Sequence, residues 1–106
     1  MAYEVSFAAL GDQTRKAVFD RLRQGPQTVG ALAAGLPVSR PAISQHLKVL
    51  KEAGLVLDQA DGARRLYRIN AKGLERLKSY LISVWEEAET AHKAEVERQL
   101  EERRYS

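Results

Sequence analysis

A run of hydroxyl, amide, imidazole and cationic side chains lies between residues 39 and 51, and it could recognise a polyanion. Arginine and lysine pair with phosphate oxygens, while serine and glutamine hydrogen-bond base edges, glutamine preferring adenine. The first carboxylate after residue 39 is Glu52. This combination predicts contact with DNA through these residues: Ser39, Arg40, Ser44, Gln45, His46 and Lys48.

The bland alternative for each of these residues is a solvated polar side chain on a surface helix. His46 precedes an apolar position, so a phosphate contact and a partly buried structural histidine that bonds the backbone both stay open. Lys48 and Lys51 could face phosphates or water. The positive charge of Arg40 at the start of the helix is unfavourable, because it lies beside the positive end of the helix dipole. This unfavourable placement favours a functional role for Arg40.

The apolar spacing places the run on one helix of about residues 40–53. Ser39 can cap its first turn, Pro41 is harmless there, and Gly54 can end the helix in a left-handed conformation. One apolar stripe follows the i, i+4, i+7 rule and consists of Ile43, Leu47 and Leu50. One side of the helix therefore packs, and the polar side can lie in a major groove.

Three shorter helices are expected before it, over residues 3–10, 13–23 and 29–34. Asp12 and Thr28 are suitable caps for the second and third, and Gly35 is expected to stop the third. A short helix, a turn and a longer capped helix form a helix-turn-helix, in which the first helix braces the second at a steep angle.

A β-hairpin is predicted over about residues 55–69. Residues 55–57 are apolar and β-prone, Asp61-Gly62 is a strong hairpin signal, and residues 66–69 alternate apolar with polar. Arg64 and Arg65 follow the turn and should project from the tip of the ribbon. Such a ribbon is a wing that can reach the DNA backbone or the minor groove.

One long helix is expected from residue 71 to about 103, interrupted only weakly by Gly73 and frayed past Thr90. Its apolar stripe is wider than one small domain needs, and a helix of about 30 residues spans roughly 45 Å. A second copy of the chain could cover this stripe together with the short first helix. The predicted dimer contacts are Val5, Phe7, Leu10, Leu77, Leu81, Val84 and Trp85.

The predicted fold is mainly α with a small β-hairpin, a winged helix-turn-helix in the order α-α-α-α-β-β-α. We expect one domain over residues 1–106, because the chain has 106 residues and 44% of them are hydrophobic. Within it, residues 12–70 form the expected DNA-binding core. Residues 3–10 and 71–103 are the expected dimerisation helices.

Charge and composition narrow the function further. Residues 1–70 hold 10 Lys/Arg against 6 Asp/Glu, whereas residues 71–106 hold 7 against 8, so the basic surface belongs to the first part. The absence of cysteine excludes disulfides and thiolate metal sites. No apolar run approaches ~18 residues and no signal peptide is recognisable, which predicts a cytoplasmic protein without a membrane partner.

No enzymatic motif is recognisable in the chain. It lacks paired carboxylates, a nucleophile with its base, and a glycine loop for phosphates, so we do not expect an enzyme. Two non-catalytic alternatives stay open beside a repressor: a small-ligand or metal-responsive derepressor of the same fold, and a winged-helix protein-interaction module.

Taken together, these segments resemble the ArsR/SmtB family of dimeric winged-helix repressors. The resemblance implies a homodimer that is joined through its first and last helices, binds double-stranded DNA at an inverted-repeat operator and represses transcription. It runs over about residues 5–85. The family-like motifs are residues 10–15, 39–47, 52–56 and 62–69.

The chain departs from the metal-sensing members of that family. Thr28 and Gly30 stand where those members carry a cysteine pair. On the last helix only His92 and Glu95 could be ligands, and a zinc site needs three or four that converge. Ser79 and Leu81 stand where earlier ligands would be. We therefore expect no metal and no cofactor. The sequence does not identify a small-molecule effector.

Overall fold

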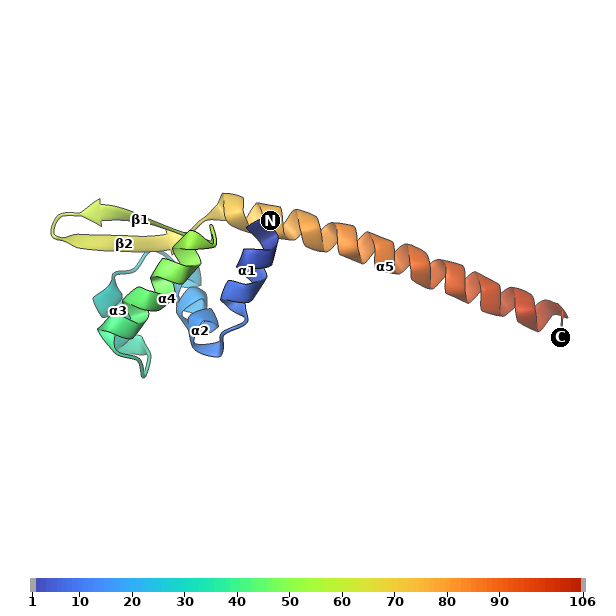
Figure 1. Ribbon diagram of the computed structural model, residues 1–106, viewed down its shortest axis with the longest axis horizontal. Helices are drawn as coiled ribbons and strands as arrows, with labels where there is room; N and C mark the ends of the chain where they lie inside the picture. The colour runs from blue at the N-terminus through green and yellow to red at the C-terminus, as the bar shows by residue number, and fades with distance from the viewer. Residues whose placement is uncertain (1, 106) are drawn as a thin grey trace.

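The computed structural model describes residues 2–105, with side chains from Val5 onward, so the predicted domain limits 1 and 106 lie outside the described residues. It confirms the predicted order of a mainly helical fold with one antiparallel hairpin (Figure 1). The elements are α1 (Ala2–Leu10), α2 (Gln13–Arg21), the 3-10 turn η1 (Leu22–Gln24), α3 (Val29–Gly35), α4 (Arg40–Glu52), β1 (Val56–Asp61), β2 (Arg64–Ile69) and α5 (Ala71–Tyr105).

Side-chain caps begin the three helices at which they were predicted. In each case a side-chain oxygen accepts a hydrogen bond from the amide three residues later, which satisfies one of the free donors of the first turn. The pairs are Asp12 with Arg15 at 2.9 Å, Thr28 with Ala31 at 3.1 Å and Ser39 with Ala42 at 3.3 Å.

The hydrophobic core lies between α2, α3, α4 and the root of the hairpin. Burying an aliphatic side chain of this size contributes about 1.5–3 kcal/mol, so the inner side of α4 is firmly held. The side chains that water does not reach are Val18, Leu32, Ile43, Leu47, Leu50 and Leu55.

Two of the predicted helix ends differ in detail from the structure. The second helix ends at Arg21 and passes into η1, earlier than the predicted residue 23. Gly35 is the last residue of α3 and has no left-handed conformation. A Cβ at Gly35 would lie 1.3 Å from a guanidinium nitrogen of Arg21, so the glycine makes room for that side chain.

The hairpin turn lies one residue later than the Asp61-Gly62 signal suggested. Asp61 pairs with Arg64, which leaves Gly62 and Ala63 as the two turn residues. Gly62 has φ of 62°, and glycine at the first turn position is typical of a type II′ turn.

The root of the hairpin is anchored to the segment before α3. Gln27 forms an isolated antiparallel bridge with Tyr67 of β2. The Gln27 amide donates to the Tyr67 carbonyl at 3.0 Å, and the Tyr67 amide donates back at 2.9 Å. These two bonds fix the position of β2 relative to α3.

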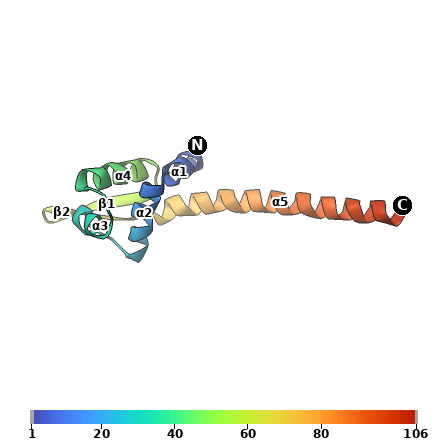
Figure 2. The same cartoon turned by 90° about the horizontal axis from the view of Figure 1, so that it is seen from below.

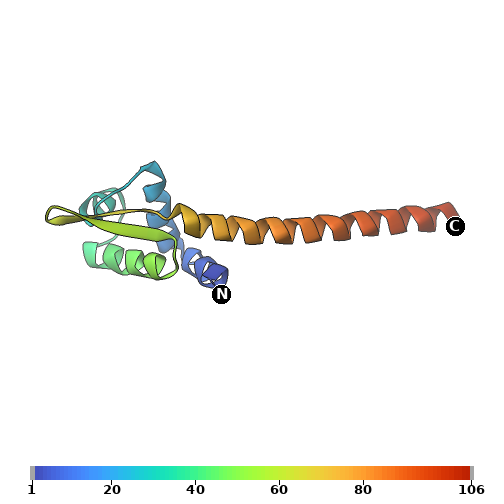
Figure 3. The ribbon, with the colours of Figure 1, turned by 90° about the horizontal axis from the view of Figure 1, so that it is seen from above.

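α5 is one uninterrupted helix of 35 residues, which corrects the expected weakness at Gly73 and the expected fraying past Thr90. Gly73 is buried where α5 crosses Gly54. Only the first turns of α5 lie against the body, beside α1, and the remainder projects far beyond it (Figure 2 and Figure 3). The molecule measures 73 × 26 × 23 Å for this reason.

Candidate nucleic-acid interface

α4 presents a polar face to solvent because its apolar stripe is buried in the core. Ile43 and Leu47 are fully buried, whereas Ser44, Gln45 and Lys48 are exposed. The core fixes the rotation of the helix, and so it fixes which side chains point outward. The exposed hydroxyl, amide and ammonium groups can donate to phosphates or hydrogen-bond base edges.

His46 is partly buried on α4 and lies near the start of α2. The Arg15 amide, which donates to the Asp12 carboxylate, lowers the pKa of Asp12, and the charge of His46 lowers it further. His46 makes no side-chain hydrogen bond to another described residue, so the structure does not support a histidine that bonds the backbone, and the phosphate contact stays a prediction.

Arg40, at the start of α4, is exposed and forms no ion pair with any residue that the structure describes. Its guanidinium lies over Gly30 of α3, where a Cβ would stand 3.4 Å from the nearest guanidinium nitrogen. Glycine at this position thus gives the arginine space beside α3.

The two wing arginines each pair with an aspartate of β1. The Arg64 guanidinium lies 3.1 Å from the Asp61 carboxylate, and Arg65 Nε donates to Asp58 at 2.8 Å. The two arginine side chains stay 68% and 55% exposed, so each keeps donors for another partner. The sequence alone did not predict these two ion pairs.

Asp58 connects the wing to α4, which sequence reasoning missed. Lys51 Nζ of α4 lies 2.7 Å from its second carboxylate oxygen, and the Asp58 side chain is only 9% exposed. Hydrogen bonds from Lys51 and from Arg65 hold the pKa of Asp58 below its usual range. The hairpin register could have suggested the contact with Arg65, because residues diagonal across two strands are within reach of long side chains.

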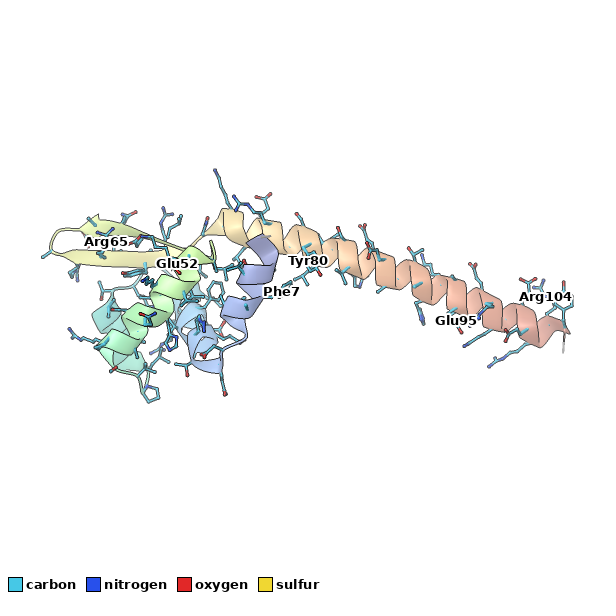
Figure 4. The ribbon with its side chains drawn as sticks, viewed as in Figure 1. Phe7, Glu52, Arg65, Tyr80, Glu95 and Arg104 are labelled. Carbon is cyan, nitrogen blue, oxygen red and sulfur yellow. The ribbon has the colours of Figure 1, made fainter. Side chains whose placement is uncertain are left out.

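One hollow gathers Arg40, Arg64 and Arg65, which come from α4 and the wing. It measures about 460 Å³, and its other wall is the start of α3 together with Tyr67. Figure 4 shows Arg65 on the wing, at the end of the body away from α5. Ser44, Gln45 and Lys48 do not line this hollow and face outward elsewhere on α4.

The predicted dimer contacts fall into two groups. Leu77 is only 7% exposed and Leu10 packs partly on the core, so both are already covered within one chain. Trp85 is 63% exposed, and Val5, Phe7, Leu81 and Val84 are exposed as well. α5 carries four further exposed large hydrophobic side chains outside the predicted set, which are Ile82, Val96, Leu100 and Tyr105.

α1 and α5 meet through aromatic rings. The rings of Phe7 and Tyr80 have centroids 5.6 Å apart at an angle of 70°, an edge-to-face contact, and they point toward each other in Figure 4. Ser6 is buried and its hydroxyl donates to the Ala53 carbonyl at 3.2 Å. These contacts fix α1 between α4 and α5, and both α1 and α5 carry exposed apolar side chains.

Within residues 2–105 no group of three or more histidine, aspartate or glutamate side chains could hold a metal ion. Thr28 uses its hydroxyl to cap α3, and Gly30 has no side chain beneath Arg40. No helix in the same part of the chain has the length and apolar character that a membrane span requires.

Comparison with known proteins identifies relatives with the same elements. Residues 10–59 match the family model described as a helix-turn-helix domain. The chain is 51% identical to the HTH-type transcriptional regulator Rv2034 of Mycobacterium tuberculosis, over 82% of this chain and 81% of that protein. It is 36% identical to the transcriptional repressor SdpR of Bacillus subtilis, over 65% of this chain and 77% of that protein.

Two solved structures are similar in fold. An ArsR-like transcriptional regulator from Rhodococcus superposes with a TM-score of 0.79 at 33% identity, covering 88% of each chain. A homodimeric winged helix-turn-helix DNA-binding domain of a possible ArsR-family regulator from Mycobacterium bovis gives 0.66 at 30% identity, covering 81% of this chain and 80% of that one.

Proposed function

This chain belongs to the ArsR/SmtB family of winged helix-turn-helix transcriptional regulators, and we propose that it is a homodimeric repressor that binds DNA sequence-specifically. One observation carries the proposal: α4 is held by a fully buried stripe while its opposite face, with Ser44, Gln45 and Lys48, is exposed. A rigid helix with such a face has the diameter and the donors that a major groove accepts.

The DNA-binding part is residues 12–70. Ser44 and Gln45 read base edges, and Arg40 and Lys48 bind phosphates. The wing, with Arg64 and Arg65, lies along the backbone or in the minor groove. The Ser39 hydroxyl caps α4, so DNA meets the backbone of the first turn at this residue. His46 lies within the same DNA-binding surface.

The dimerisation part is residues 3–10 and 71–103. Exposed apolar side chains on α1 and α5 include Phe7, Leu81 and Trp85. Exposure of these side chains to water is unfavourable, and a second copy of the chain would cover them. The Mycobacterium bovis relative is described as homodimeric, which supports the same assembly here. Two α4 helices must then present themselves roughly 34–36 Å apart, one helical turn of DNA, so that each enters a successive major groove.

Repression follows from occupancy of an operator with inverted-repeat character. Repressors among the relatives, such as SdpR, support this direction of control. DNA is the partner, so the protein acts in the cytoplasm. Neither a cofactor nor a metal is part of this proposal.

Fluorescence anisotropy with DNA from upstream of its own gene tests the proposal. We expect tight binding to one inverted repeat at a stoichiometry of two chains per site, weaker binding to shuffled duplexes, and a steep fall of affinity with salt because counterions are released. Equal affinity for every duplex would contradict sequence-specific recognition and favour a protein-interaction module.

A further inference from the structure

The hollow between α3, α4 and the wing has features that DNA reading by α4 alone does not explain. It lies at the start of α4, beside Thr28 and Gly30, and not on the helix face that carries Gln45. Its walls come from α3, α4 and the wing, and the Gln27–Tyr67 bridge holds the segment before α3 against β2. The shape of the hollow is therefore built into the fold.

The lining of the hollow is positively charged. Three arginines line it, which are Arg40, Arg64 and Arg65, and no carboxylate is among its lining residues. Asp58 and Asp61, outside the lining, pair with Arg65 and Arg64. Both carboxylates are engaged with wing or helix cations, so they do not neutralise Arg40.

Arg40 is the donor that is available to a ligand. Its guanidinium forms no ion pair with a described residue, and it lies over Gly30, whose missing side chain gives the arginine room. Guanidinium groups bind phosphate oxygens with two parallel hydrogen bonds, and several around one anion define a phosphate site. A ligand that lacks several acceptor oxygens would leave these guanidinium donors without hydrogen-bond partners.

We propose that this hollow binds one phosphate group, held by Arg40 from the recognition helix and by Arg64 and Arg65 from the wing. The inference rests on the proposed function where the phosphate belongs to the operator backbone. A free phosphate ion presents the same oxygens, so the experiment has one arm for each source. Simultaneous contact by the helix and the wing sets the depth at which α4 enters its groove.

The first arm uses operator duplexes in which one phosphate at a time is replaced by a neutral methylphosphonate. At one position per half-site the replacement should weaken wild-type binding about tenfold, the effect of one charge-assisted contact. In Arg40→Gln and in Arg64→Gln the same replacement should change affinity less than twofold, because its partner is already gone. Each variant should also lower the slope of log affinity against log salt by about 1.

The control is Lys93→Gln, which removes one exposed positive charge from α5 far from the hollow. It should keep the wild-type response to every methylphosphonate. Circular dichroism verifies that all variants are folded. If methylphosphonate replacement weakens DNA binding by the same factor in wild type and in both arginine variants at every position, the hollow does not hold a backbone phosphate.

The second arm titrates the DNA-free protein with inorganic phosphate at constant ionic strength and follows the backbone amide resonances of residues 28–30. A saturable shift in wild type that Arg40→Gln abolishes assigns the site to free phosphate. No saturable shift, together with the methylphosphonate effect, assigns it to the duplex. Absence of both overturns the proposal. A wild type that binds no DNA overturns the proposed function alone, since this second arm needs no duplex.

Discussion

Gly73 of α5 lies so close to Gly54, at the end of α4, that a Cβ on Gly73 would stand 1.9 Å from the Gly54 carbonyl oxygen. The same carbonyl accepts a hydrogen bond of 2.9 Å from Asn70 Nδ2. Gly54 itself has φ of 80°, a conformation that glycine adopts without strain. These contacts lock the first turn of α5 onto the end of α4.

Gly73→Ala should therefore destabilise the fold. Alanine raises intrinsic helix stability by about 1 kcal/mol, but its Cβ meets backbone that cannot rotate away, and overpacking of this kind costs about 1–3 kcal/mol. The clash outweighs the propensity because the whole start of α5 must move. Thermal and urea unfolding followed by circular dichroism measure the difference in the free energy of unfolding.

Gly30→Ala is the matched control for this substitution. Its Cβ would make an ordinary contact of 3.4 Å with the flexible Arg40 side chain. The free energy of unfolding should stay the same or rise by up to about 1 kcal/mol. Equal destabilisation by the two substitutions would show that the approach of Gly73 to Gly54 has no special role.

Asp58→Asn should lower the free energy of unfolding at neutral pH by about 1 kcal/mol, because the wing loses its ionic link to α4. The folded state lowers the pKa of Asp58, so the ionised carboxylate stabilises the fold above its ordinary pKa of about 4. That contribution is lost as the pH falls through the folded-state pKa. Wild type and variant should thus converge in thermal unfolding experiments as the pH falls below about 4.

Asp61→Asn serves as the comparison, since Asp61 is exposed at the turn and pairs only with the neighbouring Arg64. It should leave the unfolding temperature nearly unchanged at every pH. If the Asp58 variant showed a constant difference from wild type across the acidic range, the carboxylate charge would not be the source of the stability.

Gln45→Ala should relax sequence preference at one base pair by about 1–3 kcal/mol, because glutamine makes a directional contact with a base edge. Arg65→Ala should instead weaken binding to all duplexes alike, as expected for a backbone contact. Anisotropy against a set of duplexes with single base-pair changes measures both. Uniform loss in Gln45→Ala would remove it from the base-reading residues.

Trp85→Glu should shift the protein from dimer to monomer in sedimentation experiments, raising the dissociation constant at least about a hundredfold, because the charge would be buried in the apolar face of α5. Ser83→Glu is the control: it adds the same charge two residues away, on the opposite side of the helix. A dimer that tolerates Trp85→Glu would place the interface elsewhere.

Zinc, copper and arsenite should show no binding tighter than micromolar in calorimetric titrations. Thr28 and Gly30 offer no soft ligand, and His92 and Glu95 alone do not complete a zinc site. A tight, stoichiometric site for any of these would overturn the proposal of a metal-independent regulator.

The caps and apolar stripes were readable from the amino-acid sequence because they are local. Asp12, Thr28 and Ser39 cap helices through amides three residues away, and the stripe of α4 has the helical period. The element order and the outward face of α4 follow from these signals. They are enough to predict a winged helix-turn-helix and the residues of its polar face.

Tertiary structure decided the features that depend on contacts between distant segments. In the sequence Gly73 is only a weak helix former, and its close approach to Gly54 is seen only in the folded chain. The ion pair of Arg65 with Asp58, which Lys51 shares, is likewise formed only on folding. Periodicity describes one element at a time. The close approach of two backbones and the sharing of one carboxylate exist only after packing has set the distances between elements.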